Sequence, residues 1–352
     1  MKSTFKMSRR TMLKQSMALA ASASFISSPS FAQSKPSSIV VATSGGKLEE
    51  AYKAAYYKSW VEKTGIEVVS TANTYAKLKA MIEANAVEWD VAQIDAAVAA
   101  SFAAQGLLEP LDYSVINKDD LFPDIAKEFY LPSDLVGCVV AWNTQRVKKE
   151  AAPGNWAELW DLKRFSGQRG FWKQPFQTME IALLADGVAK DQLYPLDIDR
   201  ALKSLDKIKS EIFWWGSGAQ SAQILANGDV AAEMGWNGRL IDLRASGAPI
   251  DYHFNDALFV SDAWVIPKGS KHKKEAMEFI ANATEAKHQA IFAEVIPYGP
   301  TNRNALQYVD TARLPELASS EENFSRGVVQ DFDWWAQNGT KAGEQYNAWL
   351  LG

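Results

Sequence analysis

The chain has 352 residues, of which 47% are hydrophobic, and its formal net charge is −5 at pH 7. The composition is that of a globular protein, and the negative balance argues against nucleic acid and anionic lipid as partners. A single cysteine, Cys138, rules out an internal disulfide, and three histidines without metal-ligand spacing offer little for metal or histidine catalysis. We therefore expect no metal and no cofactor.

The first 32 residues predict an export signal. Five basic residues and no acid precede a short Ala- and Ser-rich stretch at 17–26, and positions 30–32 suit a signal peptidase. The pair Arg9-Arg10 resembles a twin-arginine signal, and the alternative is an ordinary secretory signal. The apolar stretch is too short to span a bilayer, so we expect a mature periplasmic protein from Gln33 with a net charge of −10.

The beginning of the mature chain alternates strands with helices. The pattern predicts strands at 38–42, 66–69 and 89–94, with helices at 48–63 and 75–84. This order predicts a doubly wound α/β domain with a parallel sheet. Ligands bind beyond the carboxyl ends of such strands, so the turn at 43–47 and the segment at 93–96 are candidate pocket walls.

The pattern restarts after an apolar strand at 136–143. Further strands are predicted at 171–172, 213–215, 230–236 and 259–267, and helices at 178–185, from 198, at 221–226, 274–281 and 285–293. No Gly/Ser-rich linker separates the two α/β units. We therefore expect two lobes, between which the chain crosses back and forth, with a binding cleft between them.

Several segments, taken in order, resemble the periplasmic solute-binding proteins of ABC importers, in the spermidine/putrescine-binding branch. The resembling segments are 89–91, 106–112, 137–143, 155–160, 225–230, 235–238, 262–268 and 275–280. The resemblance covers nearly the whole mature chain. It implies the periplasmic-binding-protein fold, ligand-induced closure about a hinge, and no catalytic residues.

The resemblance also implies a role and a division of the chain. The protein would capture a small molecule and deliver it to the membrane permease of an ABC importer, and we expect it to be a monomer. The first lobe would hold residues 33–136 and 264–305, and the second lobe residues 137–263 and 306–352.

Two departures from the diamine binders point to an anionic group on the ligand. Those relatives carry Trp-x-Gly-Asp, whereas this chain reads Trp236-Asn237-Gly238-Arg239. An arginine repels an ammonium group but matches a carboxylate with two parallel hydrogen bonds. The first turn lacks the aromatic and acidic residues of the diamine binders. Its Ser44, Gly45 and Gly46, followed by Lys47, offer backbone N–H groups and positive charge that suit an anion.

Other candidate residues match ammonium-binding or pocket-lining positions of the family. Asp262 would hold an ammonium group, or alternatively serve as a helix cap or hinge ion pair. Asp95 would be a second ammonium partner, or only cap the following helix. Trp215 and Trp236 would wall the cleft and Tyr298 would close one end, with core or turn packing as the alternative for each. Arg239 could instead point to solvent.

The combination favours an ω-amino acid such as γ-aminobutyrate as ligand. A polyamine binder with Arg239 turned away is the alternative within the class. From another class, a two-lobed periplasmic enzyme of the porphobilinogen-deaminase type would need a cofactor thiol in a loop, and Cys138 lies in an apolar run. A chemosensory or scaffolding protein with the same fold also stays open.

Overall fold

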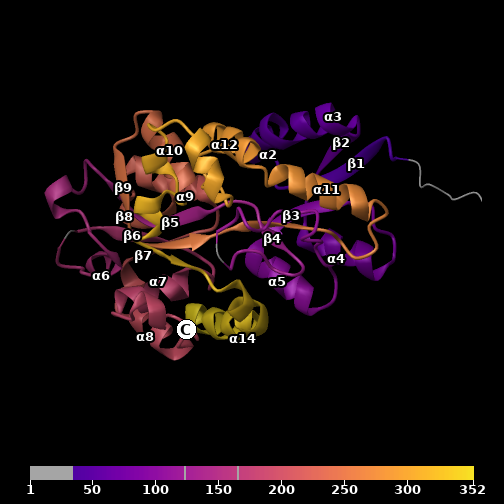
Figure 1. The fold of residues 1–352 in the computed structure, drawn as a ribbon. Coiled ribbons are helices and arrows are strands. Elements are labelled where there is room, and N and C mark those ends of the chain that lie inside the picture. The colour runs from indigo at the N-terminus through magenta and orange to yellow at the C-terminus, as the bar shows by residue number, and fades with distance from the viewer. Residues whose placement is uncertain (1–34, 123, 165) are drawn as a thin grey trace, which may run out of the picture. The chain divides into compact units, whose positions relative to one another are not determined.

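A computed structural model describes residues 35–122, 124–164 and 166–352. The expected export signal at 1–32, including Arg9-Arg10, lies outside the described residues. Residues Ser37–Gly352 form one compact unit, which contains two β-sheets. We call the sheet that holds the first strand, together with its helices, the first lobe, and the other sheet with its helices the second lobe (Figure 1).

The sheet of the first lobe has the order β2-β1-β3-β10-β4. Its strands are β1 (Ser38–Thr43), β2 (Glu67–Ala72), β3 (Val91–Asp95), β4 (Leu131–Pro132) and β10 (Asp262–Val265). β1 runs parallel to β2 and β3, as predicted, but β10 is antiparallel to both β3 and β4. The predicted parallel sheet is therefore mixed, because β10 belongs to a chain segment that returns from the second lobe.

The sheet of the second lobe has the order β11-β9-β5-β8-β6-β7. Its strands are β5 (Val136–Asn143), β6 (Gln168–Trp172), β7 (Ile212–Trp215), β8 (Val230–Trp236), β9 (Ile250–Val260) and β11 (Val328–Val329). β6 lies parallel to β7 and β8, whereas β5 is antiparallel to β8 and β9. The carboxyl ends of β6 and β8 therefore lie side by side.

Helices lie on both faces of each sheet (Figure 1). In the first lobe they are α2 (Gly46–Tyr52), a π-helical turn (Lys53–Tyr57), α3 (Lys58–Thr64), α4 (Tyr75–Glu83), α5 (Ala96–Ala104), α11 (Lys273–Ala283) and α12 (Ala286–Val295). In the second lobe they are α6 (Trp156–Leu159), α7 (Thr178–Ala185), α8 (Ile198–Asp206), α9 (Gly218–Asn227) and α10 (Asn237–Ala245). The later elements are α13 (Glu321–Phe324) and α14 (Phe332–Leu351), and short 3₁₀ turns lie at Lys149–Ala151, Lys190–Gln192, Lys209–Glu211, Arg303–Tyr308 and Leu314–Glu316.

Local signals explain several of these boundaries. The helical run that starts at Gly46 ends at Gly65, and α9 ends at Gly228, and both glycines adopt the left-handed conformation that terminates helices. α5 and α9 begin after Asp95 and Ser217, whose side chains accept hydrogen bonds from backbone N–H groups of the first turn. These boundaries agree with the sequence prediction to within a few residues.

The chain passes between the lobes at three places, one of them after α12, where the chain leaves the first lobe and continues to β11 of the second sheet. The other two places are adjacent to each other. β4 leads to β5 through Ser133–Leu135, and β9 leads to β10 through Ser261 alone. The Ser261 hydroxyl donates to the backbone carbonyl of Asp134 at 2.6 Å, and the Ser133 N–H donates to the carbonyl of Asp262 at 2.8 Å. The two crossings are therefore tied to each other. The single strand predicted at 259–267 is wrong, since it is divided at Ser261.

Candidate functional site

A cavity of about 200 Å³ lies where the carboxyl end of β3 meets the second lobe. It is lined by residues of both lobes, namely Tyr75, Asp95, Val136, Trp172, Gln177, Trp236, Val260, Ser261, Asp262 and Tyr298. Four of the nine candidate site residues are in this set: Asp95, Trp236, Asp262 and Tyr298. Pockets for drug-sized ligands measure about 300–1,000 Å³, so this cavity suits a smaller solute.

Two carboxyl groups lie together on the first-lobe wall of the cavity. Asp95 ends β3, Asp262 begins β10, and the two residues face each other in the antiparallel register. Directly opposed Cβ atoms lie about 4.5–5.5 Å apart in such pairs. One oxygen of Asp95 accepts hydrogen bonds from the N–H groups of Ala97 (2.8 Å) and Val98 (3.1 Å) and so caps α5. The capping role predicted as the alternative for Asp95 is thus present, and the residue still lines the cavity.

The carboxyl pair lacks a compensating positive charge among its described neighbours. Burial, followed by the charge of Asp262, raises the pKa of Asp95 to about 7. Burial also raises the pKa of Asp262, an effect that Gln93 opposes. The carboxyl of Asp134, in the crossing behind them, has its pKa raised by burial and by Asp262. A cation that entered the cavity would stabilise the ionised carboxylates and lower these pKa values.

Tryptophans form the second-lobe wall. The ring of Trp236 meets the ring of Trp172 edge to face, with centroids 5.2 Å apart, and both rings line the cavity. Trp215 is fully buried and packs behind them, 5.2 Å from Trp236 and 6.1 Å from Trp172 between centroids. Trp215 thus supports the wall without lining it. Such rings suit methylene groups and, through their faces, an ammonium group.

Tyr298 lines the cavity and packs against a glycine. Its ring packs so tightly on Gly238 that a Cβ at this position would overlap the Tyr298 ring. Burial raises the pKa of the Tyr298 phenol, as do Asp134 and Asp262, whereas Arg239 opposes the rise. The glycine of the Trp236-Asn237-Gly238-Arg239 segment therefore lets the start of α10 approach this tyrosine.

Arg239 lies near the cavity without lining it. Its side chain is exposed in the first turn of α10, and its effect on the pKa of Tyr298 indicates that the two side chains are close. Within the described residues, Arg239 forms no ion pair with an acidic side chain. An unpaired guanidinium at this position is available to a ligand or to solvent, and both interpretations made from the sequence stay open.

The first turn does not contribute to the lining. Ser44, Gly45 and Gly46 precede and begin α2, and none of them is among the residues that surround the cavity. The neighbouring Lys47 instead reaches across to the second lobe, where its Nζ lies 2.5 Å from Oδ1 of Asp242 in α10. The positive charge that was expected to favour an anion is therefore already paired.

Sequence reasoning missed six of the lining residues, namely Tyr75, Val136, Trp172, Gln177, Val260 and Ser261. Trp172 and Tyr75 lie in predicted elements, at the end of β6 and the start of α4, so their position beyond strand ends was the available signal. Gln177 follows β6 by five residues in a segment for which no element was predicted. Nothing in the local pattern distinguishes it from a solvent-exposed loop residue.

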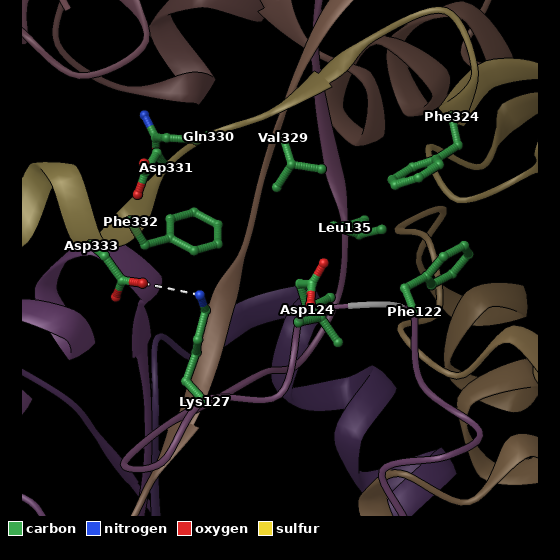
Figure 2. A pocket seen from close by; sticks show the side chains of 11 residues that line it. Phe122, Asp124, Lys127, Leu135, Phe324, Val329, Gln330, Asp331, Phe332 and Asp333 are labelled. Atoms are coloured by element: carbon green, nitrogen blue, oxygen red, sulfur yellow. Dashed lines mark hydrogen bonds and ion pairs between the residues drawn. The ribbon is translucent and has the colours of Figure 1, made fainter. Parts of the chain in front are cut away.

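A second, larger cavity of about 300 Å³ lies beside the crossing at Leu135 (Figure 2). Its walls include the rings of Phe122, Phe324 and Phe332, and Lys127 pairs with Asp333 at 3.0 Å at its edge. None of the nine candidate residues lines it. Its walls are mainly apolar, its lysine is already paired, and none of its described acids faces a second carboxyl in a strand register. The cavity beside Asp95 and Asp262 is therefore the stronger candidate site.

The described residues also bear on metals, membranes and the cysteine. They contain no group of three or more His, Cys, Asp or Glu side chains placed to hold a metal ion. None of their helices is long and apolar enough to cross a membrane. Cys138 is buried in β5, and burial raises the pKa of its thiol. A protonated, buried thiol does not suit a nucleophile or a cofactor attachment site.

Comparison with known protein families agrees with this architecture. Residues 51–319 match the family described as bacterial extracellular solute-binding protein. The chain belongs to this family. The resemblance to periplasmic solute-binding proteins of ABC importers is thereby confirmed. Members of the class bind small molecules and deliver them to a membrane permease, and they work outside the cytoplasm.

Individual relatives within the family differ in ligand. The chain is 31% identical to the gamma-aminobutyric acid-binding protein of Pseudomonas aeruginosa over 90% of its own length and 92% of the relative's. It is 39% identical to the solved Atu4243–GABA receptor, with a TM-score of 0.82 and coverage of 89% and 97%. It is 23% identical to the spermidine/putrescine-binding periplasmic protein of Escherichia coli, with coverage of 79% and 81%. The polyamine binder is therefore the more distant relative.

Proposed function

We propose that this solute-binding protein captures a short ω-amino acid, with γ-aminobutyrate as the favoured ligand. The observation that carries the proposal is the pair Asp95 and Asp262, which lines a small cavity without a cationic partner. The ligand's ammonium group would lie against these carboxyls, its methylenes against Trp172 and Trp236, and its carboxylate towards Arg239. Each part of the ligand then meets a complementary surface.

The relatives support this choice. A protein and a solved receptor that bind γ-aminobutyrate resemble the chain over about nine tenths of its length. The size of the cavity points the same way, because about 200 Å³ suits a short solute better than a long triamine such as spermidine.

Calorimetry with γ-aminobutyrate and putrescine tests the proposal. Putrescine replaces the carboxylate with a second ammonium group, which would face Arg239 without a partner. Leaving one member of a charge pair unpaired costs about 2–5 kcal/mol, so putrescine should bind roughly 30-fold to several-thousand-fold more weakly. If the wild type bound putrescine as tightly as γ-aminobutyrate, Arg239 would not be the partner of a ligand carboxylate. The polyamine alternative would then be favoured.

The variant Arg239→Asp sharpens this test. It introduces the acid that the diamine binders carry at this position, so γ-aminobutyrate binding should be lost and putrescine binding should not weaken. Arg244→Ala is the matched control, because Arg244 lies on the same helix and pairs with Asp251 and Glu316 on the surface. The control should leave the preference for γ-aminobutyrate unchanged.

We further propose that the protein is a monomer that acts in transport and not in catalysis. A deletion strain should lose high-affinity uptake of labelled γ-aminobutyrate and recover it with the wild-type gene. Incubation of the purified protein with the ligand should return the ligand unchanged. Uptake at wild-type rates in the deletion strain would favour a sensory role instead.

Export by the twin-arginine route is also a proposal. That pathway reads the arginine pair itself, so Arg9→Lys combined with Arg10→Lys should leave the precursor in the cytoplasm. Cell fractionation and immunoblotting measure the distribution. Normal periplasmic accumulation of the doubly substituted form would assign the protein to the general secretory route.

The lobe boundaries form the last part of the proposal. We place the divisions near 136/137, 263/264 and 305/306. The changes of sheet between β4 and β5 and between β9 and β10 support the first two divisions.

A further inference from the structure

A buried amide in the cavity wall has a fixed orientation. Gln177 precedes α7 and is 4% exposed, and its Oε1 accepts a hydrogen bond of 2.8 Å from Nε1 of Trp236. An indole N–H can only donate, so the amide oxygen must face Trp236 and the NH₂ group must face elsewhere. In the part of the chain that the structure describes, no side chain or carbonyl accepts a hydrogen bond from this NH₂ group.

The backbone at Gln177 is strained. Its φ is 65° and its ψ is −45°, a region that residues with a Cβ rarely adopt. Glycine would occupy this conformation without strain, yet the position carries a long amide side chain. Strain of this kind persists where the surroundings impose it, and it concentrates at ligand sites. The side chain that the strained backbone holds in the cavity wall is thus a candidate for ligand contact.

Gln177 lies on the side of the cavity where Arg239 also lies. β6 and β8 are parallel neighbours, and beyond their carboxyl ends follow Gln177 with α7 and Arg239 with α10. The N-termini of both helices add partial positive charge at this edge of the sheet. The first lobe presents Asp95 and Asp262 on the other side. The second lobe therefore offers the amide of Gln177 and positive charge, and the first lobe offers the carboxyls of Asp95 and Asp262.

We propose that Gln177 is a specificity-determining residue that donates a hydrogen bond from Nε2 to the carboxylate of the ligand. Trp236 holds the amide in the donating orientation while its ring packs on the methylenes. The inference rests on the proposed function, because it assumes that the carboxylate end lies at the second lobe. It adds a second reason for rejecting a diamine, whose ammonium group cannot accept the hydrogen bond that Gln177 offers.

Gln177→Glu tests whether the side-chain NH₂ group of Gln177 faces the ligand's carboxylate. Glutamate keeps the length of the side chain, and one of its oxygens can still accept from Trp236. The other oxygen would replace the donor with a negative charge next to the ligand's carboxylate. By calorimetry, γ-aminobutyrate should lose at least about 30-fold in affinity. The neutral analogue 4-aminobutanamide can turn its own NH₂ towards the new carboxylate and should lose less than about threefold.

Gln220→Glu is the matched control. Gln220 is exposed on the same lobe, and its Oε1 accepts a hydrogen bond of 2.8 Å from the N–H of Gly216. The substitution makes the same change of charge and preserves the acceptor, but the residue does not line the cavity. It should change the affinity for γ-aminobutyrate and the affinity for 4-aminobutanamide by no more than about threefold each. The inference would be overturned if Gln177→Glu lost the same factor of affinity for both ligands, or lost no affinity for γ-aminobutyrate.

Gln177→Met keeps the inference testable if Gln177→Glu does not fold. Methionine preserves length and removes the donor without adding charge, so γ-aminobutyrate should weaken about tenfold more than 4-aminobutanamide. Wild-type protein that does not bind γ-aminobutyrate would refute the proposed function itself. Wild-type binding that both Gln177 variants retain would refute only the role of Gln177.

Discussion

The carboxyl of Asp95 both caps a helix and lines the candidate site. One of its oxygens caps α5, and the carboxyl still lies opposite Asp262 in the cavity wall. The two alternatives that the sequence left open are compatible because a carboxylate has two oxygens. The same enclosure makes the ionised form costly in the empty protein, since its pKa rises to about 7. A group placed in this way should favour ligand binding at the expense of stability.

Asp95→Asn should therefore stabilise the empty protein and abolish binding. Because the folded-state pKa is about 7 and the ordinary value 3.8, the contribution of Asp95 to stability falls as pH rises between these values. Asparagine can still cap α5 but carries no charge. At pH 8 the variant should melt at a higher temperature, with a gain of up to about 4 kcal/mol, and the gain should vanish near pH 4. Affinity for γ-aminobutyrate should drop at least about 30-fold.

Asp90→Asn provides the contrast for this experiment. Asp90 is buried before β3 and accepts hydrogen bonds from the N–H of Val40 (2.9 Å) and the hydroxyl of Ser270 (3.1 Å). Its substitution should lower the melting temperature at pH 8 and leave the affinity nearly unchanged. If Asp95→Asn also melts below the wild type at pH 8, the raised pKa of Asp95 would be wrong.

Four of the nine candidate residues lie in the cavity wall, and their contact with a ligand stays a prediction. Asp95, Trp236, Asp262 and Tyr298 are charged or aromatic residues at strand ends or in family motifs, and all four line the cavity. Gln177 gave no such signal, because its place depends on a left-handed backbone and a distant indole. Contacts of this kind are set by tertiary structure and cannot be read from spacing along the chain.

At the scale of elements, periodicity located most helices and strands but not the crossings. Residues 259–267 form one apolar run, so nothing in the pattern indicates that the chain changes sheets at Ser261. No bounds were predicted for α5, which was expected only as the helix after Asp95, or for α10, and α14 was not predicted. α5 is nearly all apolar and lacks an amphipathic period, and α10 begins inside the motif around Arg239, which was interpreted as a ligand contact or as a solvent-exposed position.

The ion pair between α2 and α10 joins the two lobes and should slow ligand release. Lys47 Nζ lies 2.5 Å from Oδ1 of Asp242, and both side chains are partly exposed, at 41% and 43%. Exposed pairs contribute about 0.2–1 kcal/mol, so Lys47→Ala should raise the dissociation rate of γ-aminobutyrate by up to about fivefold. Stopped-flow fluorescence measures this rate, and the difference from wild type should shrink at high salt because the pair is screened.

Lys53→Ala is the control for the interlobe pair. Lys53 pairs with Glu49 at 2.7 Å within the first lobe, so its removal should not affect release. Combining Lys47→Glu with Asp242→Lys should return the dissociation rate towards that of the wild type. Equal rates for Lys47→Ala and Lys53→Ala would show that the pair does not hold the lobes together in solution.

At the scale of the whole compact unit, two kinds of connection join the lobes. The crossings at Ser133–Leu135 and Ser261 are short, extended and tied to each other by hydrogen bonds. The helix α14 packs against α5 of the first lobe and α8 of the second (Figure 1). Short extended segments can absorb a rotation through a few backbone angles, whereas a packed helix can only slide. We therefore expect the lobes to move about the two adjacent crossings at Ser133–Leu135 and Ser261.

Closure about these crossings should be visible when the ligand binds. An ammonium group held by Asp95 and Asp262 on one lobe, with a carboxylate held on the other, draws the lobes together. Saturating γ-aminobutyrate should reduce the radius of gyration in X-ray scattering, and it should change tryptophan fluorescence because Trp172 and Trp236 line the cavity. Asp95→Asn at the same ligand concentration should show neither change. Binding by calorimetry without a change in scattering would mean that the lobes are already in their binding arrangement, and hinge closure would then not be part of the mechanism.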